Sequence, residues 1–283
     1  MNTPANPRLL FISDLDGTLL NDSARVSTTT ARIISDLSHE GALISFATAR
    51  TPATVDVLLA HTFTTIPAIV LTGAAMWNRM YRRYEHMHFI DTRSASTAIC
   101  ACRAAGLNPF IYTLGKENIL HVYHNGTLNN KEEKFVYDRR GLPLKKFHID
   151  EPSGEGTVFE STILILAMGN VDTVFMLAEM LENTPGLSIS AYRDSYNHAT
   201  GLIEILGENV SKASAVTQLK SITGANHLTV FGDNLNDLPM MAVADISVAT
   251  ANAVEQVKEA ADIVIGSNND DSVAKFIRDS LSS

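Results

Sequence analysis

Short apolar runs alternate with helix-like spacing over the first third of the chain. The apolar runs cover residues 8–14, 42–50 and 67–73, and the segments with helical spacing cover residues 28–40 and 53–61. Near-continuous apolar runs are typical of strands in a parallel sheet that is covered on both faces. Gly41 and Pro52 stand where one helix would end and the next begin. This part of the chain predicts a doubly wound α/β domain.

The last third of the chain follows the same alternation. Strands are expected at residues 227–233, 246–250 and 263–266, and helices at 212–223, 238–244 and 254–261, followed by a final helix. The middle differs, because several expected strands follow one another without a helix between them. Those strands cover residues 107–114, 119–125, 134–141, 162–169, 187–194 and 202–206, with helices at 94–105 and 171–183. This order indicates a largely antiparallel α+β unit.

The fold class predicted from this pattern is α/β, with a Rossmann-like, doubly wound parallel-sheet core that contains an inserted α+β domain. The expected boundaries are 1–83 for the first part of the core, 84–207 for the insertion and 208–283 for the second part of the core. A chain of 283 residues exceeds the size at which one hydrophobic core usually keeps growing, so two domains are expected.

Charge and composition narrow the classes of partner. The net charge is −9 and no basic run is present, which argues against nucleic acid as the main partner. No apolar run reaches the roughly 18 residues of a membrane span, and the start of the chain lacks the pattern of a secretion signal. Cys100 and Cys102 would not face each other on a helix, so we expect two buried free thiols and a cytoplasmic protein. The sequence does not indicate an oligomeric state.

Two carboxylates stand at the end of the first apolar run, in DLDGT. Asp14 and Asp16 lie two residues apart, and such residues point to the same face of a strand, so both could converge on one spot. Two anions that close repel each other, and a divalent cation would relieve the repulsion. The alternative is an ordinary turn, since Asp-Gly is common in turns. An EF-hand loop is excluded because Leu19 and Arg25 occupy the positions that require Gly and Glu.

A second acidic motif, GDNLND, ends the strand predicted at residues 227–233. Asp233 and Asp237 lie four residues apart, on one side of a helix that begins there. Two acidic strand ends in one α/β domain predict an oxygen-rich site suited to Mg²⁺. Thr48 ends another strand, where its hydroxyl and the backbone N–H of Ala49 could hold an oxyanion. Lys212 opens a helix, where an ammonium would favour phosphate.

In this order, DLDGT, Thr48, Lys212 and GDNLND resemble the four motifs of the haloacid dehalogenase superfamily of phosphohydrolases. The insertion between the second and third motifs resembles the cap of its Cof-type branch. The resemblance implies that Asp14 is the nucleophile and that Asp16 is the general acid and base, with its backbone carbonyl on the metal. It also implies a role for each of the remaining motif residues: phosphate binding for Thr48, Ala49, Lys212 and Asn236, metal binding for Asp14, Asp16 and Asp233, and support of the metal for Asp237.

Some positions depart from the pattern of the family, which often has Gly at Ala49 and Asn at Thr72, and none of these departures removes a catalytic group. The resulting prediction is a Mg²⁺-dependent phosphatase that hydrolyses a small phosphorylated metabolite, such as a sugar phosphate, through an aspartyl-phosphate. A hexose phosphomutase and a non-catalytic, metal-dependent phosphoester-binding protein remain alternatives, whereas no glycine fingerprint supports a dehydrogenase. Tyr192, Arg193 and Tyr196 could contact the substrate.

Overall fold

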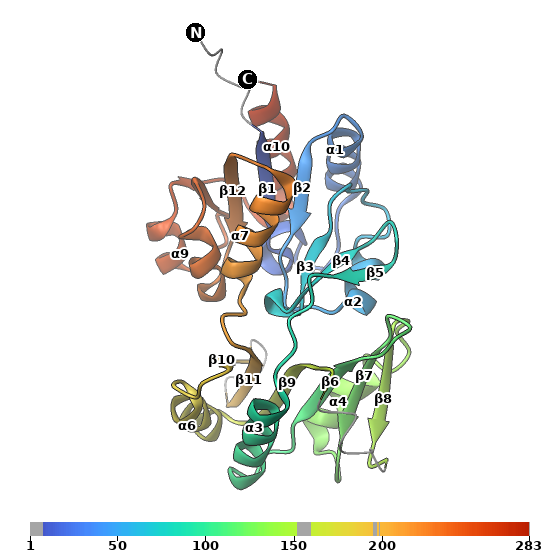
Figure 1. Ribbon diagram of the computed structural model, residues 1–283. Coiled ribbons are helices and arrows are strands. Elements are labelled where there is room, and N and C mark those ends of the chain that lie inside the picture. The colour runs from blue at the N-terminus through green and yellow to red at the C-terminus, as the bar shows by residue number, and fades with distance from the viewer. Residues whose placement is uncertain (1–7, 152–159, 195–196, 198, 283) are drawn as a thin grey trace. The chain divides into compact units, whose positions relative to one another are not determined.

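The chain divides into two compact units (Figure 1). The structure is a computed structural model that describes residues 8–151, 160–194, 197 and 199–282. One unit comprises Met1–Glu85 and Lys212–Ser283, and the other is His86–Ser211. The second unit is therefore an insertion between two stretches of chain that fold together.

The first unit is built on a five-stranded parallel sheet in the order β14-β13-β12-β1-β2. The strands are β1 (Leu9–Ser13), β2 (Leu43–Phe46), β12 (His227–Gly232), β13 (Ile246–Ala249) and β14 (Ile263–Val264). Its helices are α1 (Thr28–His39), α2 (Pro52–Leu58), α7 (Lys212–Thr223), α8 (Leu238–Met241), α9 (Glu255–Ala260) and α10 (Ser272–Leu281). The short helical turns are η1 (Leu15–Leu19), η2 (Leu71–Gly73), η3 (Leu235–Asp237) and η4 (Asn268–Asp270).

Helices cover both faces of this sheet, which explains why its strands are nearly continuous in apolar residues. On one face, Ile12 of β1 packs in the same buried cluster as Leu219 of α7. On the other face, the ring of Phe231 in β12 lies edge-on to Phe276 of α10, with centroids 5.5 Å apart. The sheet is thus doubly wound, as predicted, and the carboxyl ends of β1 and β12 are neighbours because the two strands pair in parallel register.

The third predicted strand of the first part takes a different place from the one expected. β3 (Ala68–Val70) belongs to a small antiparallel sheet with β4 (Ala75–Asn78) and β5 (Arg83–Glu85), in the order β3-β4-β5. Beside β2 it forms an isolated parallel bridge between Ala47 and Ile69, and the Ile69 carbonyl accepts a hydrogen bond from the Thr48 N–H at 3.0 Å. The sequence pattern predicted neither β4 nor β5.

The second unit contains a six-stranded sheet in the order β10-β11-β9-β6-β7-β8, which is antiparallel except for the parallel pair β7 and β8. The strands are β6 (Phe110–Leu114), β7 (Leu120–His124), β8 (Lys145–Ile149), β9 (Thr162–Asn170), β10 (Leu187–Arg193) and β11 (Thr200–Gly207). Two helices, α3 (Thr92–Ala104) and α6 (Val171–Leu181), cover one face, where Ile99 and Leu177 share a core cluster with Ile111 and Ile165. This α+β insertion agrees with the predicted fold class.

The strand predicted at residues 134–141 is wrong, because residues 134–137 belong to the helix α4 (Asn130–Tyr137) and residues 138–141 form a turn. Asn129 caps the helix: its side chain accepts hydrogen bonds from the backbone N–H groups of Lys131 and Glu132, and Glu132 accepts one from the N–H of Asn129. Such a capping box stabilises a helix start, and here it outweighs the apolar alternation that suggested a strand. The α4 helix links β7 to β8 and lies opposite α3 and α6, where Phe135 contacts Phe110.

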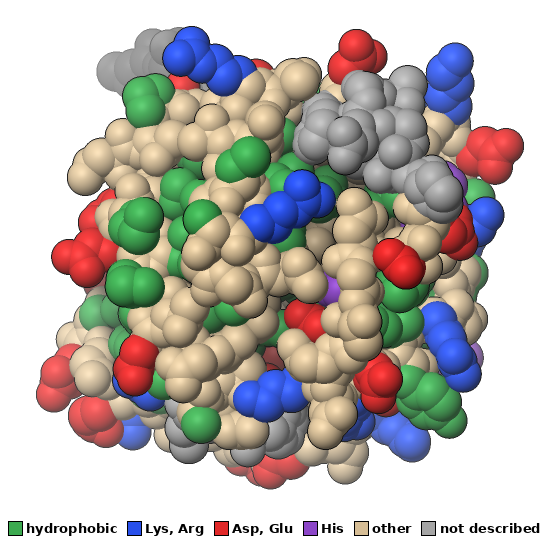
Figure 2. Space-filling view, turned by 90° about the horizontal axis from the view of Figure 1, so that it is seen from below, with side chains coloured by type: hydrophobic (Ala, Val, Ile, Leu, Met, Phe, Trp, Pro, Cys, Tyr) green, Lys and Arg blue, Asp and Glu red, His purple; other side chains and the backbone are tan. Residues whose placement is uncertain are grey.

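The distribution of charged side chains on the surface agrees with the negative net charge of the sequence. On the face of the molecule shown in Figure 2, Lys and Arg side chains stand singly among acidic and apolar ones, so the described residues form no basic field there. Within the described part of the chain, no helix combines the length and apolarity that a membrane crossing requires. Both cysteines are free thiols, but Cys100 is exposed, which corrects the expectation that both are buried, whereas Cys102 is buried.

Candidate active site

The loop that follows β1 carries the first acidic motif. The strand ends at Ser13, and the chain then turns through residues Leu15–Leu19. Gly17 has a φ of +75° inside this turn, and a Cβ at this position would overlap the Asp233 carboxylate. Only glycine meets both conditions without strain. The Gly17 carbonyl in turn accepts a hydrogen bond from Asn252 Nδ2 at 2.7 Å.

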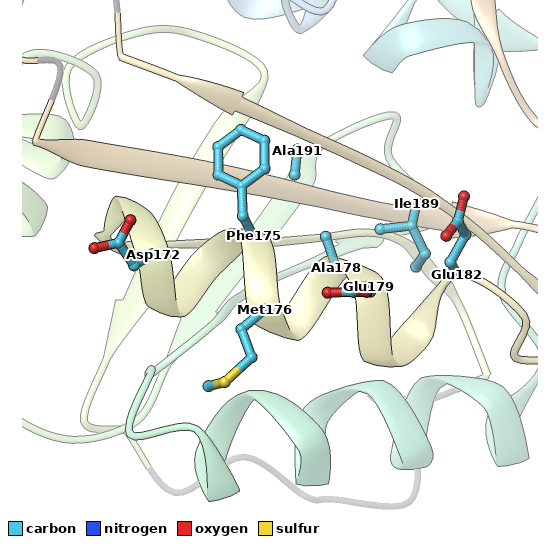
Figure 3. Close-up of a pocket in the computed structure, with 8 residues that line it drawn as sticks. All are labelled: Asp172, Phe175, Met176, Ala178, Glu179, Glu182, Ile189 and Ala191. Carbon is cyan, nitrogen blue, oxygen red and sulfur yellow. The ribbon is translucent and has the colours of Figure 1, made fainter.

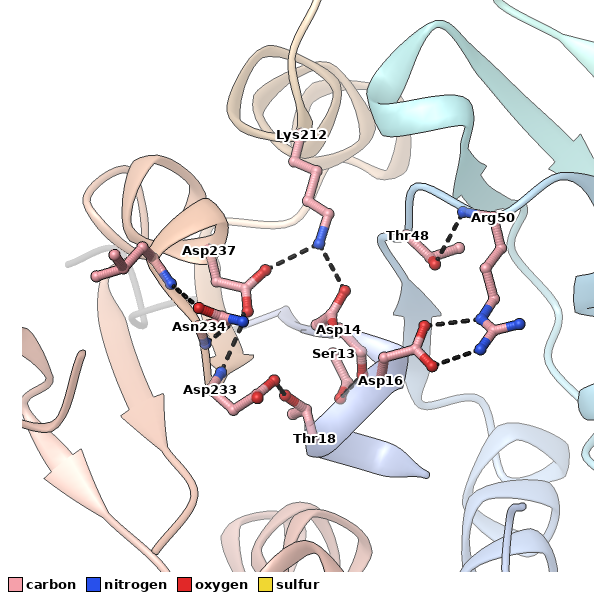
Figure 4. Close-up of polar contacts among 11 residues, drawn as sticks. Ser13, Asp14, Asp16, Thr18, Thr48, Arg50, Lys212, Asp233, Asn234 and Asp237 are labelled. Atoms are coloured by element: carbon pink, nitrogen blue, oxygen red, sulfur yellow. Dashed lines mark hydrogen bonds and ion pairs between the residues drawn. The ribbon is translucent and has the colours of Figure 1, made fainter. Parts of the chain in front are cut away.

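Asp14 lies at the centre of a buried ionic cluster (Figure 4). Its Oδ1 is 2.5 Å from Lys212 Nζ, and the same ammonium lies 2.8 Å from Asp237 Oδ1. The exposed fractions are 6% for Asp14, 4% for Lys212 and 0% for Asp237. Lys212 is the first residue of α7, so the start of this helix delivers an ammonium to the end of β1. From the sequence, Lys212 is expected to bind phosphate, and its ion pairs with Asp14 and Asp237 were not predicted.

Asp237 is held in place by the backbone after β12. Its Oδ2 accepts hydrogen bonds from the N–H groups of Asp233 at 3.1 Å and Asn234 at 3.2 Å. The bond from the Asn234 N–H is one half of the capping box of the short turn Leu235–Asp237, whose N-cap residue is Asn234. Asp233 points its Oδ1 toward Thr18 Oγ1, at 2.7 Å, and this bond joins the second acidic motif to the loop after β1.

The electrostatics of the cluster fit a cation. Carboxylate oxygens of Asp14, Asp233 and Asp237 all lie within 4.8 Å of one another. Burial and the neighbouring Asp237 raise the pKa of Asp14 well above its usual range, although Lys212 opposes the shift. Burial also raises the pKa of Asp233, to about 6. For Lys212, burial lowers the pKa, but Asp14 and Asp237 outweigh it and raise the pKa overall, so the ammonium keeps its proton.

The hydrogen bonds separate the oxygens that hold the structure from those that could bind a ligand. Both oxygens of Asp237 have protein donors, namely Lys212 and two backbone N–H groups. Asp14 and Asp233 each use only Oδ1, so among the described residues their Oδ2 atoms have no hydrogen-bond donor. Two available carboxylate oxygens beside a third, buried carboxylate are a suitable donor set for a hard divalent cation such as Mg²⁺.

Asp16 does not join this cluster, which corrects the expectation that the two carboxylates of DLDGT converge. The strand ends before Asp14, and Asp16 has φ −75° and ψ 121° inside a turn, so the alternation of a strand does not apply. The Asp16 side chain instead forms a two-bond ion pair with Arg50, with Nε to Oδ2 at 2.7 Å and Nη2 to Oδ1 at 2.5 Å (Figure 4).

Thr48 and Ala49 lie at the end of the neighbouring strand β2. Thr48 is buried, its own N–H is bonded to the Ile69 carbonyl, and its Oγ1 accepts a hydrogen bond from the N–H of Arg50 at 3.1 Å. The Thr48 hydroxyl can still donate, since an oxygen that accepts one bond keeps its proton. The N–H of Ala49 has no hydrogen-bond partner among the described residues. These two donors could hold an oxyanion.

The remaining predicted residues are Asn236, in the turn after β12, and three residues of the second unit. Asn236 is exposed, and among the described residues its side chain makes none of the hydrogen bonds that hold the cluster together. In the second unit, the Tyr192 hydroxyl donates to Glu204 Oε1 at 3.0 Å, and the Arg193 guanidinium lies over the Phe175 ring at 5.8 Å. Tyr196 lies outside the described residues.

A surface depression in the second unit is a separate feature. It lies along α6 and β10, its lining combines apolar and acidic side chains, and it contains none of the predicted site residues (Figure 3). The lining includes Phe175, Met176, Ile189, Asp172, Glu179 and Glu182.

Three residues of the acidic site were missed by sequence reasoning. Arg50 pairs with Asp16, Thr18 bonds to Asp233, and Asn252 bonds to the Gly17 carbonyl. Thr18 and Arg50 lie within or beside predicted motifs, and that proximity was the available signal. Asn252 lies 235 residues from its partner, and no local pattern marks it.

The fold and the site define a doubly wound α/β protein whose acidic residues gather at the carboxyl ends of parallel strands, where such sheets bind ligands. The chain belongs to the haloacid dehalogenase-like hydrolase family, whose sequence model matches residues 11–277. A Bacillus subtilis protein named 5-amino-6-(5-phospho-D-ribitylamino)uracil phosphatase is 27% identical, and the match covers 95% of this chain and 96% of the relative.

Solved structures show the same fold. A haloacid dehalogenase-like hydrolase from Bacteroides thetaiotaomicron superimposes with a TM-score of 0.76 at 19% identity, over 96% of this chain and 99% of that one. A crystal structure of a Thermotoga maritima protein gives a TM-score of 0.72 at 26% identity, over 95% and 96% of the two chains. The predicted superfamily, its Cof-type branch and the enzyme class, a phosphatase, are thereby confirmed.

Proposed function

We propose that the protein is a Mg²⁺-dependent phosphatase that hydrolyses a small phosphomonoester through an aspartyl-phosphate on Asp14. The observation that carries this proposal is the Asp14 carboxylate, which is buried beside Lys212 and has one oxygen without a hydrogen-bond donor among the described residues. A carboxylate that attacks a phosphate dianion needs nearby positive charge, and an ammonium at 2.5 Å provides it.

Each step then has a residue to carry it. An Asp14 oxygen bonds to phosphorus while the ester P–O bond breaks, and Asp16 gives its proton to the leaving oxygen. Asp16 next takes a proton from the water that attacks phosphorus, so that phosphate leaves and both carboxylates return to their starting state. Thr48, the Ala49 N–H, Lys212 and Asn236 are the groups proposed to hold the phosphoryl oxygens during transfer, which depends mainly on position and charge.

The residues also fit the proposed metal. Oδ2 of Asp14, Oδ2 of Asp233 and the backbone carbonyl of Asp16 would hold Mg²⁺, whereas Asp237, with both oxygens engaged, would support them. When bound, the ion supplies positive charge to the phosphoryl group and to the nucleophile. We further propose that residues 84–207 form the cap of the enzyme and carry its substrate selectivity.

Hydrolysis of p-nitrophenyl phosphate with and without Mg²⁺ tests the reaction class. We expect release of phosphate that requires the metal and is lost in Asp14→Asn. Borohydride added during turnover reduces an acyl phosphate, so peptide mass spectrometry of the wild type should find homoserine at position 14. Activity that is retained in the Asp14→Asn variant, or a trapped adduct on another residue, would contradict the proposal.

Sugar phosphates are the proposed substrate class, and one relative suggests a first compound. Because the Bacillus subtilis protein is named for 5-amino-6-(5-phospho-D-ribitylamino)uracil, this ribityl phosphate belongs in a panel with hexose and pentose phosphates. Measured kcat/KM values across the panel would rank the leaving groups. Conversion of a hexose phosphate to its isomer without release of phosphate would instead identify a mutase.

A further inference from the structure

Lys145 is a buried lysine in the second unit, far in sequence from the motifs of the acidic site. It opens β8, and its side chain is 8% exposed. Its Nζ lies 5.6 Å from the centroid of the Tyr112 ring and 5.9 Å from that of Phe147. These distances are within the range of cation–π contacts. The ammonium end of Lys145 therefore rests on aromatic rings rather than on water.

No acidic group in the described part of the chain neutralises Lys145. Among the described residues, no carboxylate forms an ion pair with it and no acceptor receives a hydrogen bond from it. Burial lowers its pKa to about 7, and the nearby guanidinium of Arg139 adds to this shift. Lysine is almost never buried without a partner, because an unpaired charge in an apolar setting is costly.

Two acidic side chains on this face of the sheet contact groups other than Lys145. Glu204 of β11 accepts the hydroxyl proton of Tyr192, and Glu132 of α4 lies 3.7 Å from His124 Nε2 and bonds to a backbone N–H. Burial raises the pKa of Tyr112 on β6 more than the Arg139 charge lowers it, so this phenol stays neutral. The described groups around Lys145 thus include a guanidinium and neutral rings, and no described carboxylate forms an ion pair with the lysine.

Arg139 is placed to act together with Lys145. It follows α4, its Nη1 donates to the Phe135 carbonyl at 3.2 Å, and its guanidinium carbon lies 4.2 Å from the centroid of the Phe135 ring. The Phe135 and Phe147 rings meet edge to face, with centroids 6.3 Å apart. One set of packed aromatic rings therefore carries both basic side chains.

We propose that Lys145 and Arg139 form an anion-binding site in the second unit, for a phosphate or carboxylate group. An anion that enters favours the charged form of Lys145, so the amine takes one proton from solvent and becomes an ammonium paired with the ligand. No covalent bond forms. The anion has two possible sources, namely a second acidic group of the substrate or a free metabolite that acts as an effector.

A titration of the intact protein tests the site directly. Lysine labelled with ¹³C at Cε reports the protonation of each amine by NMR, and the Lys145 signal is assigned by its loss in Lys145→Met. In chloride, we expect the Lys145 signal to titrate near pH 7, as its burial indicates. Inorganic phosphate or malonate at equal ionic strength should raise that midpoint by about one unit or more, since one unit corresponds to a tenfold preference for the charged form. Lys134, an exposed lysine, should not respond.

Two outcomes would overturn the proposal. One is a Lys145 signal that titrates with the surface lysines, and the other is a midpoint near pH 7 that neither phosphate nor malonate moves. Arg139→Gln gives a further check, because loss of the guanidinium should raise the midpoint in chloride and also reduce the shift caused by anions. Arg140→Gln removes an adjacent, exposed arginine that lies over Tyr137 and should change neither quantity.

Kinetics then distinguish the two sources of the anion, and this arm alone rests on the proposed phosphatase activity. If the anion belongs to the substrate, Lys145→Met should lower kcat/KM about tenfold or more for esters with a second carboxylate or phosphate, since the loss of one charged hydrogen bond is worth roughly a factor of ten. The kcat/KM for p-nitrophenyl phosphate should stay unchanged. If the anion is an effector, malonate should change the wild-type rate with every ester, and Lys145→Met should abolish that effect. A protein without phosphatase activity would still give the NMR result.

Discussion

Replacement of Lys212 by Met should destabilise the metal-free protein strongly. The ammonium lies between Asp14 at 2.5 Å and Asp237 at 2.8 Å, and all three side chains are almost completely buried. Removal of one member of a buried ion pair costs about 3–5 kcal/mol, because the remaining charge has no partner. Two carboxylates would lose their partner here, but Asp14 already has a raised pKa and can take up a proton. We therefore expect a loss of about 3 kcal/mol in EDTA at neutral pH.

Lys220→Met is a matched control in the same helix. Lys220 pairs with Asp245 at 2.7 Å, but both side chains are partly exposed, at 26% and 38%. Exposed ion pairs contribute about 0–1 kcal/mol, so this variant should unfold close to the wild type. The comparison keeps the residue type, the substitution and the helix the same, and changes only the burial of the pair.

Urea unfolding followed by tryptophan fluorescence measures the free energy of unfolding of each variant and reports on the structural unit that contains Lys212. Trp77 is the single tryptophan of the chain and is fully buried in the unit that contains Lys212. Added Mg²⁺ should recover more stability in Lys212→Met than in the wild type, because the three carboxylates then have no competing ammonium. The reasoning is refuted if Lys212→Met unfolds within about 1 kcal/mol of the wild type in EDTA, or if Lys220→Met costs as much.

Three further substitutions test other contacts. Arg50→Gln should lower kcat on p-nitrophenyl phosphate by about 10–100-fold and alter the pH–rate profile with little change in KM, since Asp16 loses the group that orients it. The control Arg32→Gln breaks an exposed ion pair on α1 and should leave both kcat and the pH–rate profile unchanged. Gly17→Ala should cost about 1 kcal/mol or more in urea unfolding, because it places a Cβ at a φ of +75°. Between pH 7 and pH 10 the unfolded chain holds a proton on Lys145 that the folded protein lacks, so the free energy of unfolding of the wild type rises with pH in this window. Lys145→Met should remove up to about 4 kcal/mol of that rise. Urea unfolding followed by circular dichroism at each pH measures it.

The layout of the first unit could be predicted because it depends on local patterns. The apolar runs at β1, β2 and β12 are continuous because both faces of the sheet are covered, and the motifs follow these strands directly. The helix α7 was placed correctly from residue 212 to residue 223. The error at α4 has a local cause, since the capping box of Asn129 and Glu132 was present in the sequence and was not used.

The direction of individual side chains could not be predicted in the same way. Asp14 and Asp16 were expected on one face, but the strand stops one residue earlier and the two carboxylates find different partners, Lys212 and Arg50. The pair between Asp16 and Arg50 joins residues 34 positions apart, and its existence depends on how the ends of β1 and β2 turn. Contacts of this kind require the backbone coordinates, because periodicity ends where the regular element ends.

The hydrogen bonds of the acidic cluster assign separate tasks to its oxygens. One oxygen of Asp237 accepts a hydrogen bond from Lys212 and the other accepts hydrogen bonds from two backbone N–H groups, so Asp237 fixes the positions of the lysine and of the turn after β12. Asp14 and Asp233 are each anchored through Oδ1, to Lys212 and Thr18, and each keeps Oδ2 without a donor among the described residues. A carboxylate that was free to rotate would lose entropy on binding a cation or attacking phosphorus, whereas these two are already oriented. The buried anchors therefore explain how a site with three mutually repelling carboxylates can remain ordered and still offer oxygens for chemistry.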